Sequence, residues 1–214
     1  PDRANPLWRD VVQNSRDDFC VSELLVTTLS SKSDPRLDKF SQETTTGSII
    51  GMPYGLTDNE ATLLKPTTSR PDESLRQTTS PSVIFSLAEV QFLLAEAYER
   101  GILSGSAESA YANAIKASMN YWGITDDSAI NSYISSQPYN SSNWKESIGM
   151  QKWIALYMNG YEAWAEWRRL DYPQLVVPSA AVETSIPTKL PYPRSEVSNN
   201  SASLGKVSTT PGSI

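Results

Sequence analysis

The 214-residue chain contains no histidine. This absence excludes Ser-His-Asp and Cys-His nucleophile systems, histidine general bases and most catalytic zinc sites. The single cysteine, Cys20, can form neither an internal disulfide nor a cysteine cluster for a metal. We interpret it as a small buried apolar side chain instead of a reactive thiol. We therefore expect no catalytic residue, no metal site and no cofactor.

Stretches of basic residues and long apolar runs are also lacking. The formal net charge is −6 and the largest basic cluster is Arg168-Arg169, which argues against nucleic acid as a partner. No run of about 18 apolar residues is present, so we expect no membrane-spanning helix. The sequence opens on Pro1-Asp2-Arg3-Ala4-Asn5-Pro6, without the features of a signal peptide. We expect any export signal or lipid anchor to have been removed or to lie upstream.

The first 82 residues divide into a helical start over 1–38 and an irregular loop region over 39–82. A helix is expected from about Phe19 to Leu29, with Asp34-Pro35 as the end of that segment because the residue before proline disfavours helical dihedrals. Threonine, serine, proline and glycine dominate after it. A loop region of this length is either functional or disordered, and both interpretations stay open.

A helical hairpin is predicted within residues 83–172. Ser86-Leu87-Ala88-Glu89 is a capping-box sequence, and apolar residues follow at helical spacing as far as Gly101. A second helix is expected over 107–121, ended by Gly123. Its face is formed mainly by small residues, Ala110, Ala114 and Ala117, which allows two helix axes to approach closely.

A long helix is expected from about Trp144 to Leu170, after a polar stretch over 124–146. Asn143 and Glu146 can cap it, and Trp153, Trp164 and Trp167 recur at helical steps, which indicates a buried face. The tail over 173–214 is expected to be extended over the surface. The predicted fold class is mainly α, with a tetratricopeptide-like helical hairpin, a long C-terminal helix and extensive irregular loops. No second copy is found at a period near 34 residues.

Four stretches share their order and spacing with one known family. They are Ser33–Leu37 with Gly51–Leu56; Ala88–Ala97 continuing to Ala114–Met119; Gln151–Tyr157 leading to Glu166–Arg169 and Tyr172-Pro173; and Leu190–Pro193 with Glu196 and Asn199-Asn200. Together they resemble the SusD/RagB family, and the stretch from Gln151 to Arg169 is the specific one. Members are usually about twice as long, with a lipidated cysteine near the start. The resemblance therefore implies that residues 1–214 are the C-terminal part of a SusD-like domain.

The resemblance also implies a function. SusD-like proteins are surface-exposed outer-membrane lipoproteins of Bacteroidota, attached by a lipid anchor that would lie outside this chain. They cover a SusC-like TonB-dependent transporter and bind oligosaccharides or polysaccharides for import, without chemistry on the ligand. Capture of peptides instead of glycans is an alternative within the same family.

Ligand-binding candidates come from aromatic residues in predicted loops, because sugar rings pack their apolar faces on aromatic planes beside polar groups. The candidates are Trp8, Tyr54, Tyr139 and Trp144. No family binding motif matches this sequence residue by residue. The family's use of loops upstream of the final helix pairs favours Trp8 and Tyr54.

Two other classes of function are considered. A helical adaptor would bind a protein partner in a groove built by stacked hairpins. A glycoside hydrolase would need two opposed carboxylates, and Glu162 and Glu166 are one helical turn apart. An ion-paired face is the favoured interpretation, because Glu166 can pair with Arg169 three residues later. Asp17-Asp18 and Asp126-Asp127 could bind calcium but form no EF-hand loop, so we interpret them as turn residues or helix starts.

Overall fold

The computed structural model describes residues 4–178, 181 and 184–204. In this part of the chain there are eleven α-helices and no strands, only two isolated β-bridges. The helices are α1 (Pro6–Trp8), α2 (Glu23–Ser31), α3 (Leu37–Phe40), α4 (Asp58–Leu64), α5 (Leu87–Glu99), α6 (Ala107–Tyr121), α7 (Asp127–Ser136), α8 (Trp144–Ala155), α9 (Gly160–Leu170), α10 (Arg194–Asn199) and α11 (Ser201–Leu204). The predicted mainly-α class is confirmed.

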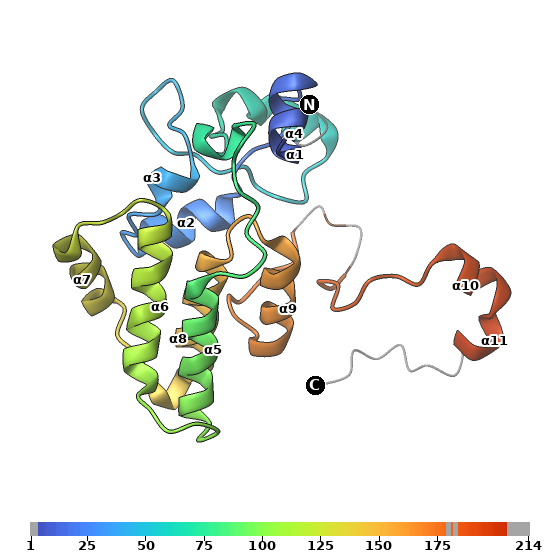
Figure 1. The fold of residues 1–214 in the computed structure, drawn as a ribbon. Coiled ribbons are helices and arrows are strands. Elements are labelled where there is room, and N and C mark those ends of the chain that lie inside the picture. Colours follow the sequence, from blue (N-terminus) through green and yellow to red (C-terminus); the bar gives the residue numbers. More distant parts are fainter. Residues whose placement is uncertain (1–3, 179–180, 182–183, 205–214) are drawn as a thin grey trace.

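The elements form two layers and a tail (Figure 1). Short helices α1 to α4 and their connecting loops make the N-terminal layer, and α5 to α9 make a helical bundle beneath it. The segment that leads into α5 descends from the N-terminal layer to the bundle. Helices α10 and α11 belong to a tail that stands away from the bundle.

Local signals account for the hairpin of α5 and α6, which pack along each other. The Ser86 hydroxyl accepts a hydrogen bond from the Glu89 backbone N–H at 3.1 Å and so caps the start of α5. Gly101 and Gly123 follow the two helices with φ of +67° and +75°, a conformation that glycine adopts without a Cβ penalty. The predicted hairpin is confirmed.

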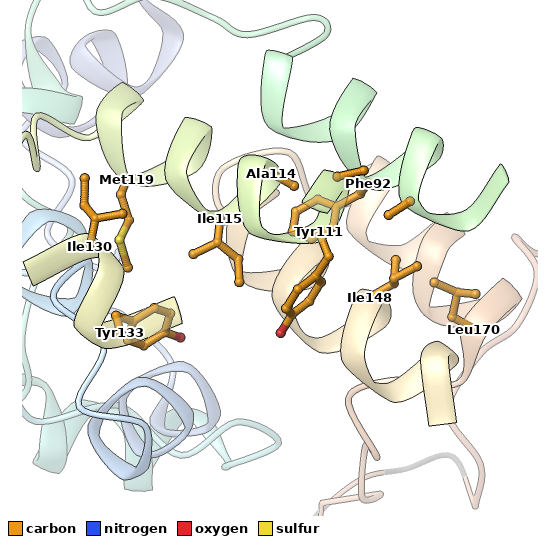
Figure 2. Close-up of a cluster of buried hydrophobic side chains, with 11 residues drawn as sticks. Phe92, Tyr111, Ala114, Ile115, Met119, Ile130, Tyr133, Ile148 and Leu170 are labelled. Carbon is orange, nitrogen blue, oxygen red and sulfur yellow. The ribbon is translucent and has the colours of Figure 1, made fainter. Parts of the chain in front are cut away.

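The main core lies between the hairpin and helices α7, α8 and α9 (Figure 2). Its buried side chains come from all five helices of the bundle: Phe92, Ala95, Ala110, Tyr111, Ala114, Ile115, Met119, Ile130, Tyr133, Ile148 and Leu170. The alanines of α6 let this helix approach its neighbours, as the small-residue face predicts.

The single helix predicted over 144–170 is wrong, because the structure has two helices there. Helix α8 ends at Ala155 and α9 begins at Gly160, and Met158 between them has a left-handed φ of +71°. The reversal lets α9 pack against α8, which a straight helix could not do. As a result Trp153 and Trp167 lie on different helices and do not share a single face.

Other boundaries also differ from the prediction. The helix predicted from about Phe19 is α2, which begins at Glu23 because the Ser22 hydroxyl accepts from the Leu25 N–H and caps it. The stretch expected to be irregular over 39–82 contains α4, which has a complete Thr57–Glu60 capping box. The polar stretch over 124–146 contains α7. The tail, expected to be extended, includes α10 and α11.

A buried polar network joins the N-terminal layer to the bundle. Arg36 and Asp34 are both fully buried and form an ion pair at 2.6 Å. The Arg36 guanidinium also donates to the Ser118 hydroxyl of α6 and the Gln151 amide oxygen of α8, both at 2.9 Å. The Tyr133 hydroxyl of α7 donates to Asp34 at 2.6 Å. One arginine thus connects three helices of the bundle to the loop after α2.

An aromatic cluster strengthens the same junction. The Phe40 ring of α3 stacks on the Tyr157 ring with centroids 4.2 Å apart and meets the Trp122 ring edge-on at 4.7 Å. The Tyr157 hydroxyl donates to the Phe40 carbonyl oxygen at 3.2 Å. Because Trp122 follows α6 and Tyr157 follows α8, these rings pack the N-terminal layer onto the ends of two bundle helices.

Candidate functional site

Charged residues of α5, α8 and α9 form one connected chain inside the bundle. The Lys152 ammonium lies 3.1 Å from one oxygen of Glu166, whose other oxygen lies 2.6 Å from the Arg169 guanidinium. Arg169 also pairs with Glu96 of α5 at 2.6 Å. Four charged residues from the stretches that carry the family resemblance, Glu96, Lys152, Glu166 and Arg169, therefore meet in one place. Glu166 is committed to two cations, which agrees with the ion-paired interpretation.

Burial and charge act in opposite directions on the two buried carboxyls of α5. Burial raises the pKa of Glu89, and the positive charge of Lys152 only partly offsets this. Burial would also raise the pKa of Glu96, but the hydrogen bonds and charges of Arg169 and Arg100 bring it below its ordinary value. Among the described residues, Glu96 is ion-paired and Glu89 has no cationic partner within ion-pair distance.

A large apolar groove opens where the N-terminal layer meets the bundle, with a volume of about 1290 Å³. One wall is the segment Val83–Leu87 that leads into α5, and the floor includes the aromatic rings of Trp122 and Tyr157. Several apolar side chains on it are exposed, and Ile84 has 92% of its surface accessible. Others are Val83, Phe85, Leu87, Tyr121 and Met158. We call this feature the α5 groove.

Carboxylates are the main charged groups of the α5 groove. Glu89 lines it from α5, and Asp38 and Asp72 line it from the N-terminal layer. Lys39 is the single cation among the lining residues. The groove thus combines an apolar surface with a net negative potential.

A second, smaller hollow of about 350 Å³ lies beside the start of α8 and the end of α9. The half-buried rings of Trp144 and Tyr172 border it. Polar groups surround these rings: Ser142, Asn143, Lys145, Arg169, Asp171 and Gln174. Aromatic faces beside amide, carboxylate and cationic groups are the combination that sugar binding requires. We call this feature the Trp144 pocket.

The four predicted ligand residues do not converge on one site. Trp144 is the one that lines either of these two hollows. Tyr139 packs against the main core, and its hydroxyl donates to the Glu99 carboxylate at 2.7 Å. Tyr54 is exposed in the N-terminal layer and donates to the Val176 carbonyl oxygen at 2.9 Å. Trp8 is half-buried at the end of α1.

The remaining candidates have structural partners. Asp126 caps α7 through the Ser128 N–H at 2.9 Å, and Asp17 pairs with Lys65 at 2.8 Å. Cys20 is half-buried instead of buried in an apolar setting, and its sulfur accepts a hydrogen bond from Arg70 at 2.6 Å. In the part of the chain that the structure describes, no cluster of acidic, cysteine or histidine side chains is arranged to hold a metal ion.

Sequence reasoning missed both hollows. The α5 groove had a visible signal, since Val83-Ile84-Phe85 is an apolar run immediately before a helix cap in an otherwise polar region. The Trp144 pocket had no local signal. It is made of two segments, 142–145 and 169–174, that meet because α9 folds back on α8.

The described helices define a mainly α-helical architecture with a tetratricopeptide-like hairpin, and ion pairs connect α5, α8 and α9. The family model named SusD-like, described as "Starch-binding associating with outer membrane", matches residues 2–193. The chain therefore belongs to this SusD-like family. Among proteins with curated functions, none is similar enough in sequence to count as a match.

Solved structures show the same fold. A chitin-binding protein is 27% identical with a TM-score of 0.80, and the match covers 94% of this chain and 48% of that one. A SusD homologue from Bacteroides ovatus is 24% identical with a TM-score of 0.78, covering 95% and 50% of the two chains. One from Bacteroides thetaiotaomicron is 24% identical with a TM-score of 0.73, covering 87% and 46%. The chain thus spans about half the length of these relatives.

None of the helices in the described residues combines the length and apolarity needed to cross a bilayer.

Proposed function

We propose that this chain is part of a non-catalytic cell-surface protein that binds oligosaccharides or polysaccharides and passes them to a TonB-dependent, SusC-like outer-membrane transporter. The observation that carries the proposal is the family match over residues 2–193, whose description names starch binding and the outer membrane. The structural similarity to a chitin-binding protein supports a glycan as the ligand class. Attachment to the membrane would be through a lipid anchor outside this chain.

The charge pairing argues against Glu166 as a glycosidase carboxylate, the role considered for it from the sequence. A glycosidase needs one protonated and one free carboxylate facing each other across a cleft. Glu166 is paired with Lys152 and Arg169, and Glu96 is paired with Arg169 and Arg100, so neither is free to attack or protonate a sugar. Both acids hold helices together instead.

We assign the Trp144 pocket as a glycan contact. The Trp144 indole and the Tyr172 ring would support sugar faces, and the Asn143 and Gln174 amides and the Asp171 carboxylate would bind hydroxyl groups. Trp8 and Tyr54, in the N-terminal layer, are proposed as further contacts. The rings of Tyr139 and Trp144 both pack against the main core, and Tyr139 is the weakest of the four candidates because its hydroxyl is also engaged by Glu99.

Affinity electrophoresis through gels containing α-glucan, β-glucan, mannan, pectin, mucin or soluble chitin derivatives tests the proposal. We expect retardation in one polymer class, and a loss of roughly three- to tenfold in affinity for Trp144→Ala, because a stacked ring contributes about 0.5–1.5 kcal/mol beyond the area it buries. Tyr161→Ala is the matched control, since Tyr161 is 81% exposed and lines neither hollow. A peptide library run in parallel tests the peptide alternative.

Retardation that Trp144→Ala leaves unchanged would remove the Trp144 pocket from the proposal and move the test to Trp8→Ala and Tyr54→Ala. Binding of peptides but of no glycan would overturn the ligand class. Reducing ends released from the retained polymer would overturn the non-catalytic assignment.

A further inference from the structure

The dipeptide Asn159-Gly160 lies where the chain reverses between α8 and α9, and it is the single asparagine-glycine pair in the sequence. Asn159 is the N-cap residue of α9, at φ −114° and ψ 69°, and Gly160 is the first residue of that helix. Asn159 is half-buried and Gly160 is exposed, so water reaches the peptide group that joins them. Glycine has no Cβ to shield its backbone nitrogen, which makes an asparagine before it prone to lose its side-chain amide.

The two groups that would react are not engaged by the rest of the described chain. The Asn159 side chain does not cap α9, although asparagine is a preferred N-cap residue. The Gly160 N–H is one of the first amide groups of α9, which have no carbonyl within the helix to bind, and no other backbone carbonyl of the described residues accepts from it. A Cβ added at Gly160 would meet nothing within 4 Å, so the space beside its nitrogen is open.

One backbone hydrogen bond fixes the peptide group between Asn159 and Gly160. The Ala163 N–H donates to the Asn159 carbonyl oxygen at 3.0 Å, in the first turn of α9. The ends of helices open more readily than their centres, and loss of this bond frees rotation about ψ of Asn159. That rotation brings the Gly160 nitrogen to the Asn159 Cγ atom without unfolding of the bundle.

We propose that Asn159 is a site of spontaneous deamidation in the folded chain. Hydroxide removes the Gly160 amide proton, and the nitrogen attacks the Asn159 Cγ atom. The N–Cγ bond forms, the Cγ–Nδ2 bond breaks, and the side-chain nitrogen leaves as ammonia after it takes a proton from water. Water then opens the resulting succinimide ring at either carbonyl, which gives aspartate or isoaspartate at position 159. This inference is independent of the glycan-binding proposal.

The two products have opposite effects on the reversal between α8 and α9. Aspartate places a negative charge at the N-terminus of α9, where the helix dipole favours it. Isoaspartate adds a methylene group to the main chain in the reversal that brings Glu166 within 3.1 Å of Lys152. We therefore expect the isoaspartate form to melt at least about 2 °C below the unmodified chain, and the variant Asn159→Asp to melt no lower than it.

Incubation of the purified chain under native conditions, followed by peptide mass spectrometry, tests the proposal. Aspartate and isoaspartate are distinguished by labelling with protein-isoaspartate methyltransferase. We expect Asn159 to deamidate at least about tenfold faster than Asn140 and Asn200, each of which precedes a serine. The rate is expected to rise with pH, because hydroxide removes the Gly160 proton.

Two variants locate the reaction. Gly160→Ala is expected to slow the loss of the Asn159 amide at least about tenfold without disturbing the fold, because its Cβ enters open space. Tyr161→Ala, one residue further on and 81% exposed in the wild type, is the control and leaves the rate unchanged. Circular dichroism confirms that each variant is folded.

Three results would overturn the proposal. The first is an Asn159 that deamidates no faster than Asn140 and Asn200. The second is an unchanged rate in Gly160→Ala. The third is an Asn159 that stays intact in the folded chain but deamidates once the chain is unfolded in urea, which would show that the first turn of α9 protects it.

Discussion

At the scale of single residues, Arg36 is central to the contact between the N-terminal layer and the helical bundle. Its guanidinium is fully buried and contacts Asp34, Ser118 and Gln151 at 2.6–2.9 Å. Burial opposes its charge, but the hydrogen bonds and charge of Asp34 outweigh burial and raise the pKa of Arg36 above its ordinary value. The net contribution of such a buried ion pair to the free energy of unfolding is small. Removal of one partner is nevertheless strongly destabilising, because the other charge stays buried without compensation.

Arg36→Met is therefore expected to lower the free energy of unfolding by about 3–5 kcal/mol, because it leaves Asp34 buried without its cation. Urea denaturation followed by tryptophan fluorescence measures the change. Arg194→Ala, at an exposed position of α10, is the control and is expected to stay within about 0.5 kcal/mol of the wild type. An Arg36→Met loss below about 1 kcal/mol would show that the network is not what joins the two layers.

Glu89 is expected to make the folded chain less stable as pH rises, which is the reverse of the usual effect of a carboxyl group. Burial raises its pKa in the folded state above the ordinary value of 4.5, so the folded chain holds this proton where the unfolded chain has lost it. Stability from this group is present below pH 4.5 and is lost as pH rises through the folded-state pKa. Glu89→Gln removes the effect, and the variant is expected to gain stability relative to the wild type as pH increases above 4.5.

Glu99 is expected to change the pH dependence of stability in the opposite direction to Glu89, and it serves as the control for that experiment. Hydrogen bonds from the Ser141 and Tyr139 hydroxyls lower the pKa of Glu99. Its stabilisation is present at neutral pH and is lost as pH falls through the folded-state pKa, so Glu99→Gln is expected to lose stability relative to the wild type as pH rises. Thermal melts across pH 3.5–8 compare both variants, and parallel curves for Glu89→Gln and wild type would contradict the assignment.

At the scale of elements, the reversal of the chain between α8 and α9 brings the charged and aromatic residues of these two helices together. It brings Arg169 and Asp171 beside Trp144 and brings Glu166 to Lys152. The close contact also constrains α8. A Cβ added at Gly149 would lie 2.9 Å from the Tyr172 Cβ and 3.3 Å from the Leu170 Cβ, so this glycine is required for the packing of α8 against the chain after α9.

Gly149→Ala is consequently expected to destabilise the protein by about 1–3 kcal/mol, although alanine is the better helix former. Gly160→Ala, at the first residue of α9, is the matched control, because nothing lies within 4 Å of its added Cβ. That substitution is expected to be neutral or to stabilise by up to about 1 kcal/mol. Differential scanning calorimetry of the two variants checks the sign of each change, and equal effects would show that the contact relaxes freely.

At the scale of the whole molecule, the chain consists of a well-packed two-layer body and an exposed tail. Every described side chain from Lys189 to Ser203 is exposed, and Leu190 and Val197 are among them. The Trp164 indole N–H donates to the Pro187 carbonyl oxygen at 2.9 Å and ties the chain just before this stretch to α9. Figure 1 shows α10 and α11 standing away from the bundle.

Limited proteolysis is expected to cut first within 188–204 and to leave a product that retains the two layers, because exposed backbone with few tertiary contacts opens most readily. Mass spectrometry of the early fragments locates the cuts, and circular dichroism of the truncated product reports its helices. A first cut between α8 and α9 would show that the reversal around Met158 opens more easily than the tail.

The sequence by itself determined the fold class, the hairpin of α5 and α6 and the family. These depend on signals within a few residues of one another: the Ser86 cap, the apolar spacing after it and the glycines at 101 and 123. The break near Met158 had a signal, the turn dipeptide Asn159-Gly160, but the tryptophans at helical spacing on both sides of it favoured one continuous helix. Helix α7 escaped because it buries only Ile130 and Tyr133 and most of its other residues are polar.

Only the tertiary structure decided the places where ligands and partners could bind. Lys152 meets Glu166, and Trp144 meets Tyr172, through the reversal of α9. Glu89 of α5 lines the α5 groove together with Asp38 and Asp72 of the N-terminal layer. Helix caps and apolar periodicity act over one or two turns, and sequence can show them. Hollows and buried charges arise from contacts between segments far apart in the chain, whose proximity depends on the packing of the whole molecule.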